Sequence, residues 1–218
     1  GRKVPAYIQK VTLALSDERA RIDREFDDLL KNVEHIKEIV SAQQSMAKSS
    51  GFVQELDAVD LVRDALAANK GSLYNHHIKI DECIDFAVPR FYSDKHRILQ
   101  VLINLIKNAK DAVKSQHSGV PVIRISVSTL PDAVSFTVED NGVGIPADKL
   151  DKIFQHGFTT KRMGHGFGLH SSANTAAELG GSLTVKSDGP GKGACFTFCV
   201  PLSPPTFANK ARQIEVHS

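Results

Sequence analysis

The chain has 218 residues, of which 41% are hydrophobic and 24% are charged, as in an ordinary soluble globular protein. The net charge of +2 includes no long run of one sign, which argues against nucleic acid as a partner. No apolar run approaches the about 20 residues that span a membrane and no secretory signal is visible, so we expect a cytoplasmic chain without a membrane partner in this stretch.

The first predicted element is a long amphipathic helix over residues 5–48. Apolar residues recur there at spacings of three and four between charged ones. A stripe this long needs a partner, because one small domain cannot bury it along its whole length. We therefore expect residues 1–51 to form a helical dimerisation segment that pairs two copies of the chain. The alternative is that the helix folds back on the domain that follows.

A globular domain is expected over residues 52–202, followed by a flexible tail over residues 203–218. Segments with helical periodicity and segments with period-two alternation both occur in the domain. The predicted fold class is α+β, a two-layer α/β sandwich in which a mixed sheet carries helices on one face. The long amphipathic helix precedes it.

The first part of the domain is predicted to contain one helix and two extended segments. Asp57 is placed to cap a helix that runs through Ala68, because Gly71 follows as a helix-ending residue. The extended segments are expected at residues 77–83 and 86–92.

The strongest helical pattern covers residues 97–115, with Asp94 placed to cap its start. Asn104 and Asn108 lie one turn apart beside the apolar stripe of this helix. A buried amide must find hydrogen-bond partners, and a bound ion or ligand would supply them. The alternative is that the two amides simply lie on a solvated edge of the helix.

Four strands and one more helix complete the domain. Period-two alternation predicts an antiparallel hairpin from residues 122–128 and 134–140. The last two strands are expected at residues 182–187 and 194–201, and a helix is expected to begin near Leu169.

Three motifs follow the asparagine pair. Asp140-Asn141-Gly142-Val143-Gly144-Ile145-Pro146 ends an apolar strand, Phe154 and Phe158 bracket a short segment, and Gly164-His165-Gly166-Phe167-Gly168-Leu169 opens the later helix. Taken alone, Asp140-Asn141-Gly142 would be read as a plain turn. Together and in this order, the motifs resemble the nucleotide-binding domain shared by sensor histidine kinases, DNA gyrase, the Hsp90 chaperone and the MutL repair protein. The resemblance covers residues 53–202.

This resemblance implies ATP and Mg²⁺ as cofactors. The carboxylate of Asp140 would accept a hydrogen bond from adenine N6 and reject guanine, whose corresponding atom is a carbonyl oxygen. The amide oxygen of Asn108 would be the protein ligand of Mg²⁺, a hard ion that prefers oxygen. The expected nucleotide-binding set is Asn104, Asn108, Asp111, Asp140, Gly142, Gly144, Ile145, Lys161, Gly164, His165, Gly166, Phe167, Gly168 and Leu169.

Residues 155–168 are rich in glycine and poor in apolar side chains, so we expect a mobile lid. The helix that begins near Leu169 would offer free N–H groups and a positive dipole end to phosphates. Lys161 is expected to be the catalytic cation that neutralises the terminal phosphates. For His165 and His170, beside the glycines, phosphate contact and solvent exposure both stay open.

Members of the family that hydrolyse ATP have a glutamate at the position of Asn104, where it activates water. An amide cannot accept a proton near neutral pH, so Asn104 disfavours hydrolysis and preserves the γ-phosphate for a protein acceptor. The resemblance therefore implies the catalytic core of a two-component sensor histidine kinase. Its phosphate acceptor would be a histidine upstream of these residues, and its partner a response regulator receiver domain.

Residues 33–40 look like the second helix of the dimerisation hairpin that precedes the catalytic domain in histidine kinases. His35 lacks the acidic residue that directly follows the phosphate-accepting histidine in the family, so we expect the acceptor elsewhere. The chain would then be the cytoplasmic part of a larger sensor protein. Two alternatives stay open: a serine kinase of the same superfamily, or a non-enzymatic module whose interactions depend on bound nucleotide.

Overall fold

The computed structural model describes residues 52–85, 88–116, 119–159 and 166–203, and in the N-terminal stretch residues 12, 15, 18, 19, 21, 22, 25, 26 and 29. The chain divides into two compact units, Gly1–Ser50 and Gly51–Ser218. The described residues of the first unit are helical, and Leu15, Ile22, Phe26 and Leu29 expose more than half of their surface. No helix among the described residues is long and apolar enough to cross a membrane.

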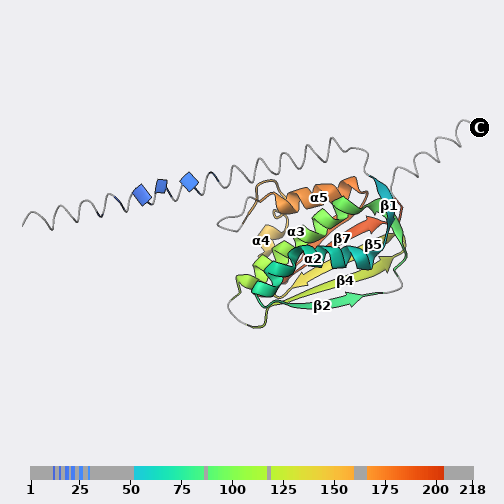
Figure 1. The fold of residues 1–218 in the computed structure, drawn as a ribbon, viewed down its shortest axis with the longest axis horizontal. Coiled ribbons are helices and arrows are strands. Elements are labelled where there is room, and N and C mark those ends of the chain that lie inside the picture. Colours follow the sequence, from blue (N-terminus) through green and yellow to red (C-terminus); the bar gives the residue numbers. More distant parts are fainter. Residues whose placement is uncertain are drawn as a thin grey trace, which may run out of the picture. The chain divides into compact units, whose positions relative to one another are not determined.

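The second unit is a two-layer α/β sandwich. Its elements are β1 (Val53–Leu56), α2 (Ala58–Asn75), β2 (Lys79–Ile84), β3 (Phe91–Asp94), α3 (Lys95–Lys114), β4 (Val122–Leu130), β5 (Ala133–Asp140), α4 (Ala147–Leu150), α5 (Gly168–Glu178), β6 (Ser182–Lys186) and β7 (Ala194–Pro201). Five strands form a mixed sheet in the order β2-β4-β5-β7-β6, in which only β2 and β4 pair in parallel. Figure 1 shows α2, α3 and α5 on one face of this sheet. The predicted fold class is confirmed.

Helix α3 lies between α2 and α5 and forms the centre of the core. Asp94 caps it as predicted, because its Oδ1 accepts a hydrogen bond from the N–H of Arg97 at 3.2 Å. Each fully buried apolar side chain contributes about 1.5–3 kcal/mol, so this face is strongly held against the sheet. The buried residues of α3 are Ile98, Val101, Leu102, Leu105, Ile106, Ala109 and Val113.

Helix α2 is longer than predicted. Its buried positions recur every four residues, at Leu61, Ala65, Asn69 and Leu73. Burial of one leucine contributes about 1.5–3 kcal/mol, whereas a glycine inside a helix costs only about 1 kcal/mol relative to alanine. The helix therefore continues through Gly71 to bury Leu73, which corrects the predicted end.

The extended segment predicted at residues 86–92 is also corrected. Strand β3 begins only at Phe91, and it pairs with β1 in a separate antiparallel sheet rather than joining the main one. Pro89 has no N–H to donate to a strand ladder, and residues 88–90 are not in a strand. Residues 86 and 87 lie outside the described residues. The other predicted strands agree with the structure within two residues at each end.

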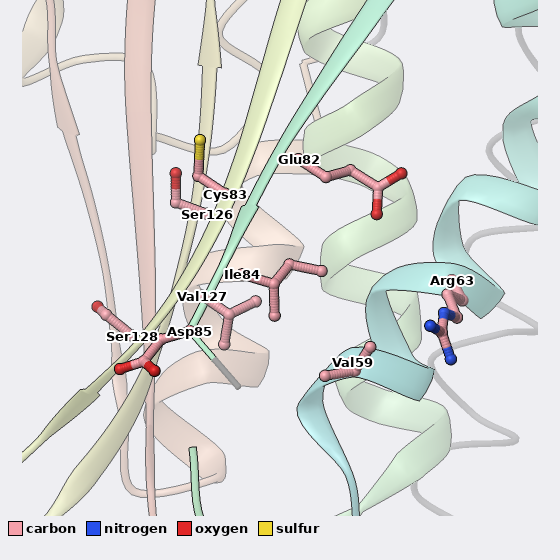
Figure 2. A pocket seen from close by; sticks show the side chains of 9 residues that line it. All are labelled: Val59, Arg63, Glu82, Cys83, Ile84, Asp85, Ser126, Val127 and Ser128. Carbon is pink, nitrogen blue, oxygen red and sulfur yellow. The ribbon is translucent and has the colours of Figure 1, made fainter. Parts of the chain in front are cut away.

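Strand β2 is one edge of the main sheet, and a hollow of about 540 Å³ lies beside it. Figure 2 shows Ile84 and Val127 on the helical side of the sheet and Cys83 and Ser126 on the opposite side. The residues that line the hollow are Val59, Arg63, Glu82, Cys83, Ile84, Asp85, Ser126, Val127 and Ser128.

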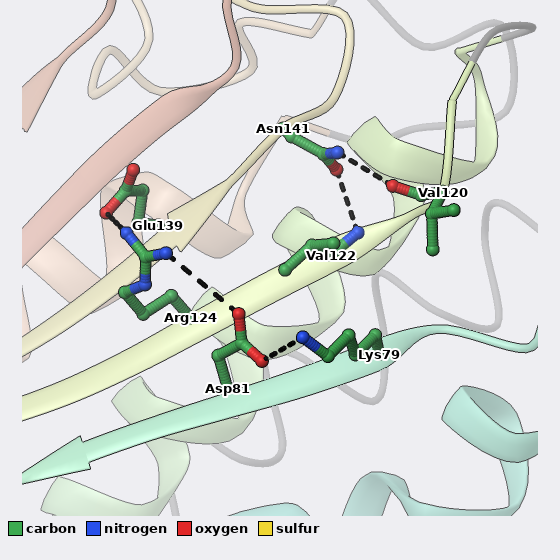
Figure 3. Close-up of polar contacts among 7 residues, drawn as sticks. All are labelled: Lys79, Asp81, Val120, Val122, Arg124, Glu139 and Asn141. Atoms are coloured by element: carbon green, nitrogen blue, oxygen red, sulfur yellow. Dashed lines mark hydrogen bonds and ion pairs between the residues drawn. The ribbon is translucent and has the colours of Figure 1, made fainter.

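The sheet face without helices is polar. Arg124 of β4 pairs with Glu139 of β5 at 3.6 Å and with Asp81 of β2 at 3.9 Å, and Lys79 pairs with Asp81 at 2.9 Å (Figure 3). Such solvent-accessible pairs contribute only about 0–1 kcal/mol each, so the stability of the fold comes mainly from the apolar face under the helices.

Candidate functional site

Helix α3 presents three oxygen-bearing side chains on one side. Asn104, Asn108 and Asp111 are spaced by four and three residues, which places them on a common face beside the buried stripe. All three are half-buried. Asp111 pairs with Lys110 at 3.4 Å, and the Nζ of Lys110 also donates to the hydroxyl of Ser72 at 3.1 Å. Amide and carboxylate oxygens of this kind suit a hard cation or the donor groups of a ligand.

Asp140 is the last residue of β5, and only 5% of it is exposed. Its Oδ1 accepts a hydrogen bond from the N–H of Gly142 at 2.8 Å. Burial raises the pKa of this carboxyl to about 6; hydrogen bonds from the backbone of Gly142 and Ala194 oppose the rise, and the charge of Glu139 adds to it. A buried acid that titrates this close to neutral pH is typical of functional sites.

The loop after Asp140 is pressed against α3. The N–H of Val143 donates to the carbonyl of Ala112 at 3.2 Å. A Cβ at Gly142 would lie 2.6 Å from the same carbonyl oxygen, so only glycine allows the two backbones to approach this closely. The contact brings the loop to the last turns of α3, next to Asp111.

The amide of Asn141 holds the loop on its outer side. Its Oδ1 accepts from the N–H of Val122 at 2.8 Å, and its Nδ2 donates to the carbonyl of Val120 at 2.8 Å (Figure 3). Both bonds reach the beginning of β4, which neighbours β5 in the sheet. Asn141 therefore fixes the direction in which the chain leaves β5, and with it the place of Asp140.

The segment between β6 and β7 supports the loop from a third side. The hydroxyl of Ser187 accepts from the N–H of Ile145 at 3.0 Å, and the N–H of Gly191 donates to the carbonyl of Val143 at 2.7 Å. Gly144 has a φ of +67°, a conformation that favours glycine. The glycine-rich segment before β7 thus serves here as a brace for the loop.

The start of α5 packs against Asn104. The Nδ2 of Asn104 donates to the hydroxyl of Ser172 at 2.8 Å, and Ser172 is buried. A Cβ at Gly168 would lie 2.7 Å from the Oδ1 of Asn104, so the last glycine of its motif lets α5 approach α3. Gly166, just before α5, lies against the backbone of Gly157 and Phe158.

The two ends of the predicted lid meet at a ring cluster. The ring of His156 lies 4.6 Å from that of Phe167 and 5.1 Å from that of His170, between centroids. The Nδ1 of His170 lies 2.8 Å from the carbonyl oxygen of Phe154. His170 is therefore engaged at the base of the lid. Lys161, Gly164 and His165 lie outside the described residues.

Two segments thus contact helix α3: the Asp140 loop packs against its last turns, and the start of α5 packs against Asn104. The family model described as "Histidine kinase-, DNA gyrase B-, and HSP90-like ATPase" matches residues 93–204, a span that includes all three pieces. The chain belongs to this ATPase family. The description of this family as an ATPase implies ATP as the ligand.

The relatives within this ATPase family include sensor histidine kinases. The chain is 32% identical to the sensor histidine kinase ZraS of Escherichia coli K12 over 176 residues, covering 80% of the chain and 37% of ZraS. It is 33% identical to the sensory histidine kinase/phosphatase NtrB of Rhizobium leguminosarum bv. phaseoli over 142 residues, covering 60% of the chain and 37% of NtrB. The chain therefore spans little more than a third of these curated relatives.

A solved structure agrees with these sequence relatives. The nucleotide-free catalytic domain of the histidine kinase ThkA matches with a TM-score of 0.62 and 29% identity. The match covers 70% of this chain and 99% of the ThkA domain. Over this share of its length, the chain thus has the architecture of a histidine kinase catalytic domain.

The predicted nucleotide-binding residues of this ATPase domain gather around α3 where the structure describes them. Asn104 and Gly168 are in contact, and the Asp140 loop carries Gly142, Gly144 and Ile145. Leu169 packs against the core. The hollow beside β2 shares no residue with this set, so we do not take it as the site. Its lining carries none of the motifs that the family match includes.

Three residues that hold the site together were not in the predicted nucleotide-binding set: Asn141, Ser172 and Ser187. Asn141 had a recognisable signal, because asparagine at the end of a strand commonly bonds to nearby backbone. Ser172 and Ser187 had none. Their contacts to the site, with Asn104 and Ile145, span 68 and 42 residues of the chain, so only the fold brings these partners together. Ser187 also donates locally to the carbonyl of Gly193 at 2.6 Å.

Proposed function

We propose that residues 52–202 bind ATP with Mg²⁺ and form the catalytic core of a two-component sensor histidine kinase. In this role the domain transfers the γ-phosphate of ATP to a histidine upstream of these residues. The observation that supports the proposal most is the meeting of three motif segments on one helix: the polar face of α3, the Asp140 loop and the start of α5.

The adenine end of the proposed site is the Asp140 carboxyl. It is buried and held by the N–H of Gly142, so it is already oriented before ligand arrives. An ionised carboxylate accepts hydrogen bonds only, which matches the exocyclic amine of adenine and opposes the carbonyl of guanine. Gly142 lets the loop lie directly against the backbone of α3, which keeps its N–H in place beside Asp140.

The phosphate end of the proposed site lies between α3 and the start of α5. Asn108 would supply an amide oxygen to Mg²⁺, a hard ion that takes few protein ligands and would neutralise phosphate charge. The N–H groups in the first turn of α5 have no partner within the helix, and the positive end of the helix dipole lies beside them, so both attract anions. Lys161 supplies the cation that neutralises the terminal phosphates, and Asp111 lies next along the face of α3.

Asn104 makes the proposed site suited to phosphoryl transfer rather than hydrolysis. Its amide cannot take a proton from water near neutral pH, and its Nδ2 is committed to Ser172. The γ-phosphate therefore stays available for a protein acceptor brought to the site. We propose that the acceptor helix is supplied by a dimer formed through residues 1–51, and that the phosphate then passes to a receiver domain.

The test is phosphorylation of the histidine-bearing helix hairpin of the same sensor protein, made separately and mixed with this chain. With ATP labelled at the γ-phosphate, we expect label on the hairpin that is lost in acid and kept in base, as phosphohistidine is. This chain alone should stay unlabelled. Acid-stable label on serine would show a serine kinase, and ATP binding without transfer to any hairpin would favour the non-enzymatic module.

A further inference from the structure

The amide of Asn104 contacts two residues in the first two turns of α5, Gly168 and Ser172. Its Nδ2 donates to the hydroxyl of Ser172 at 2.8 Å, and its Oδ1 lies 2.7 Å from the place where a Cβ of Gly168 would be. Gly168 and Ser172 are one helical turn apart, so they lie on the same side of α5. Only 4% of Ser172 is exposed.

Ser172 is the polar one of the two buried residues of α5; the other, Ala176, lies one turn further on. Serine is a poorer helix former than alanine, and a buried hydroxyl is unfavourable unless it is hydrogen-bonded. The hydroxyl is therefore matched to its partner, the amide of Asn104.

We propose that Ser172 is a positioning residue that fixes the amide of Asn104 and, through it, the start of α5 relative to α3. The inference rests on the proposed function, because it concerns the phosphate end of that site. Asn108 lies one turn beyond Asn104 on α3, and α5 begins at Gly168. The hydrogen bond thus sets the distance between the Mg²⁺ ligand and the N–H groups that bind phosphate.

The adenine end has separate supports. The Asp140 loop is held by Ala112, by β4 through Asn141, and by Ser187, none of which contacts α5 through a hydrogen bond that the structure gives. Loss of the Ser172 hydroxyl should therefore disturb the γ-phosphate and leave the base in place. ATP and ADP share adenine and differ in the γ-phosphate, so the pair of ligands separates the two ends.

The experiment compares Ser172→Ala with the wild type by calorimetric titration of the whole chain with ATP and ADP in Mg²⁺. We expect ATP affinity to fall about five- to tenfold, as for one hydrogen bond, and ADP affinity to change less than about twofold. Ser171→Ala is the matched control, since Ser171 lies in the same turn and is exposed. It should change neither affinity.

Two further measurements separate a positioning role from a merely structural one. Asn104→Ala and the double variant Asn104→Ala/Ser172→Ala should have the same ATP affinity, because Ser172 acts only through Asn104. The NMR signals of the Asn104 side-chain amide, identified as those that Asn104→Ala removes, should move in Ser172→Ala and not in Ser171→Ala. Additive losses, an unchanged ratio of ATP to ADP affinity, or unmoved signals would each overturn the inference. A wild type that binds neither nucleotide would instead contradict the proposed function.

Discussion

Asn108→Ala should remove the part of ATP binding that depends on Mg²⁺. The variant lacks the proposed protein ligand of the ion. Even the mutation of a residue that only hydrogen-bonds to a metal ligand commonly costs about 10- to 100-fold in metal affinity. We expect ATP affinity in Mg²⁺ to fall at least about a hundredfold, to the value that the wild type shows in a chelator. Calorimetric titration with ATP, with and without Mg²⁺, measures both quantities.

Lys107→Ala is the matched control for this experiment. Lys107 precedes Asn108 on α3 and is exposed, so its removal should leave the Mg²⁺ dependence of ATP binding unchanged. Thermal unfolding of both variants shows whether α3 is intact, since α3 carries the centre of the core. Asn108→Ala with wild-type ATP affinity in Mg²⁺ would remove Asn108 from the site.

ATP affinity should fall as the pH is lowered through the pKa of Asp140. Burial raises this pKa to about 6, and the proposed hydrogen bond from adenine N6 needs the ionised carboxylate. Binding then competes with protonation, so we expect affinity to be nearly constant above pH 7 and about tenfold weaker at pH 5. Asp140→Asn should bind weakly at every pH, without this dependence. A wild-type affinity that does not change between pH 5 and pH 7.5 would contradict the assignment.

The same carboxyl should make the nucleotide-free domain less stable at neutral pH than at acidic pH, where the carboxyl is protonated. The folded pKa of about 6 lies above the ordinary value of 3.8, so the folded state keeps a proton that the unfolded state has lost between these pH values. The free energy of unfolding therefore falls as pH rises through this window, by roughly 3 kcal/mol for a pKa difference of about two. Above pH 6 the cost is constant.

Asp140→Asn removes that cost, because an amide does not ionise and its oxygen can still accept from Gly142. We expect the variant to resist urea better than the wild type at pH 7.5 and about equally at pH 4, without nucleotide. A variant that is less stable than the wild type at pH 7.5 would show that the carboxylate stabilises the fold and does not destabilise it.

Much of the fold was accessible from local patterns. Asp94 and the apolar stripe of α3 predict that helix, because capping and helical periodicity act within a few residues. The hairpin of β4 and β5 follows from alternation that matches one buried face. The elements whose bounds were predicted wrongly depend on contacts between distant parts of the chain. Helix α2 continues past Gly71 because Leu73 is buried, and β3 begins at Phe91, where it pairs with β1.

The sequence predicted which motifs form the candidate site, but it did not predict which of their residues contact each other. Asn104, Asn108 and Asp140 are recognised because the order of the motifs resembles that of the family, and not from any one motif alone. Gly168 was expected among the nucleotide-binding residues, and in the fold it also makes room for Asn104 of a different helix. Contacts such as this one and that of Ser172 depend on two helices far apart in the chain, so no local pattern contains them.

The most direct measurement is a calorimetric titration of the chain with ATP and with GTP, each with Mg²⁺ and in a chelator. If the three segments around α3 form one adenine- and Mg²⁺-dependent site, ATP should bind in Mg²⁺ and GTP at least about a hundredfold more weakly. Removal of Mg²⁺ should weaken ATP binding. Equal affinity for the two nucleotides, or ATP binding that is the same without Mg²⁺, would contradict that site.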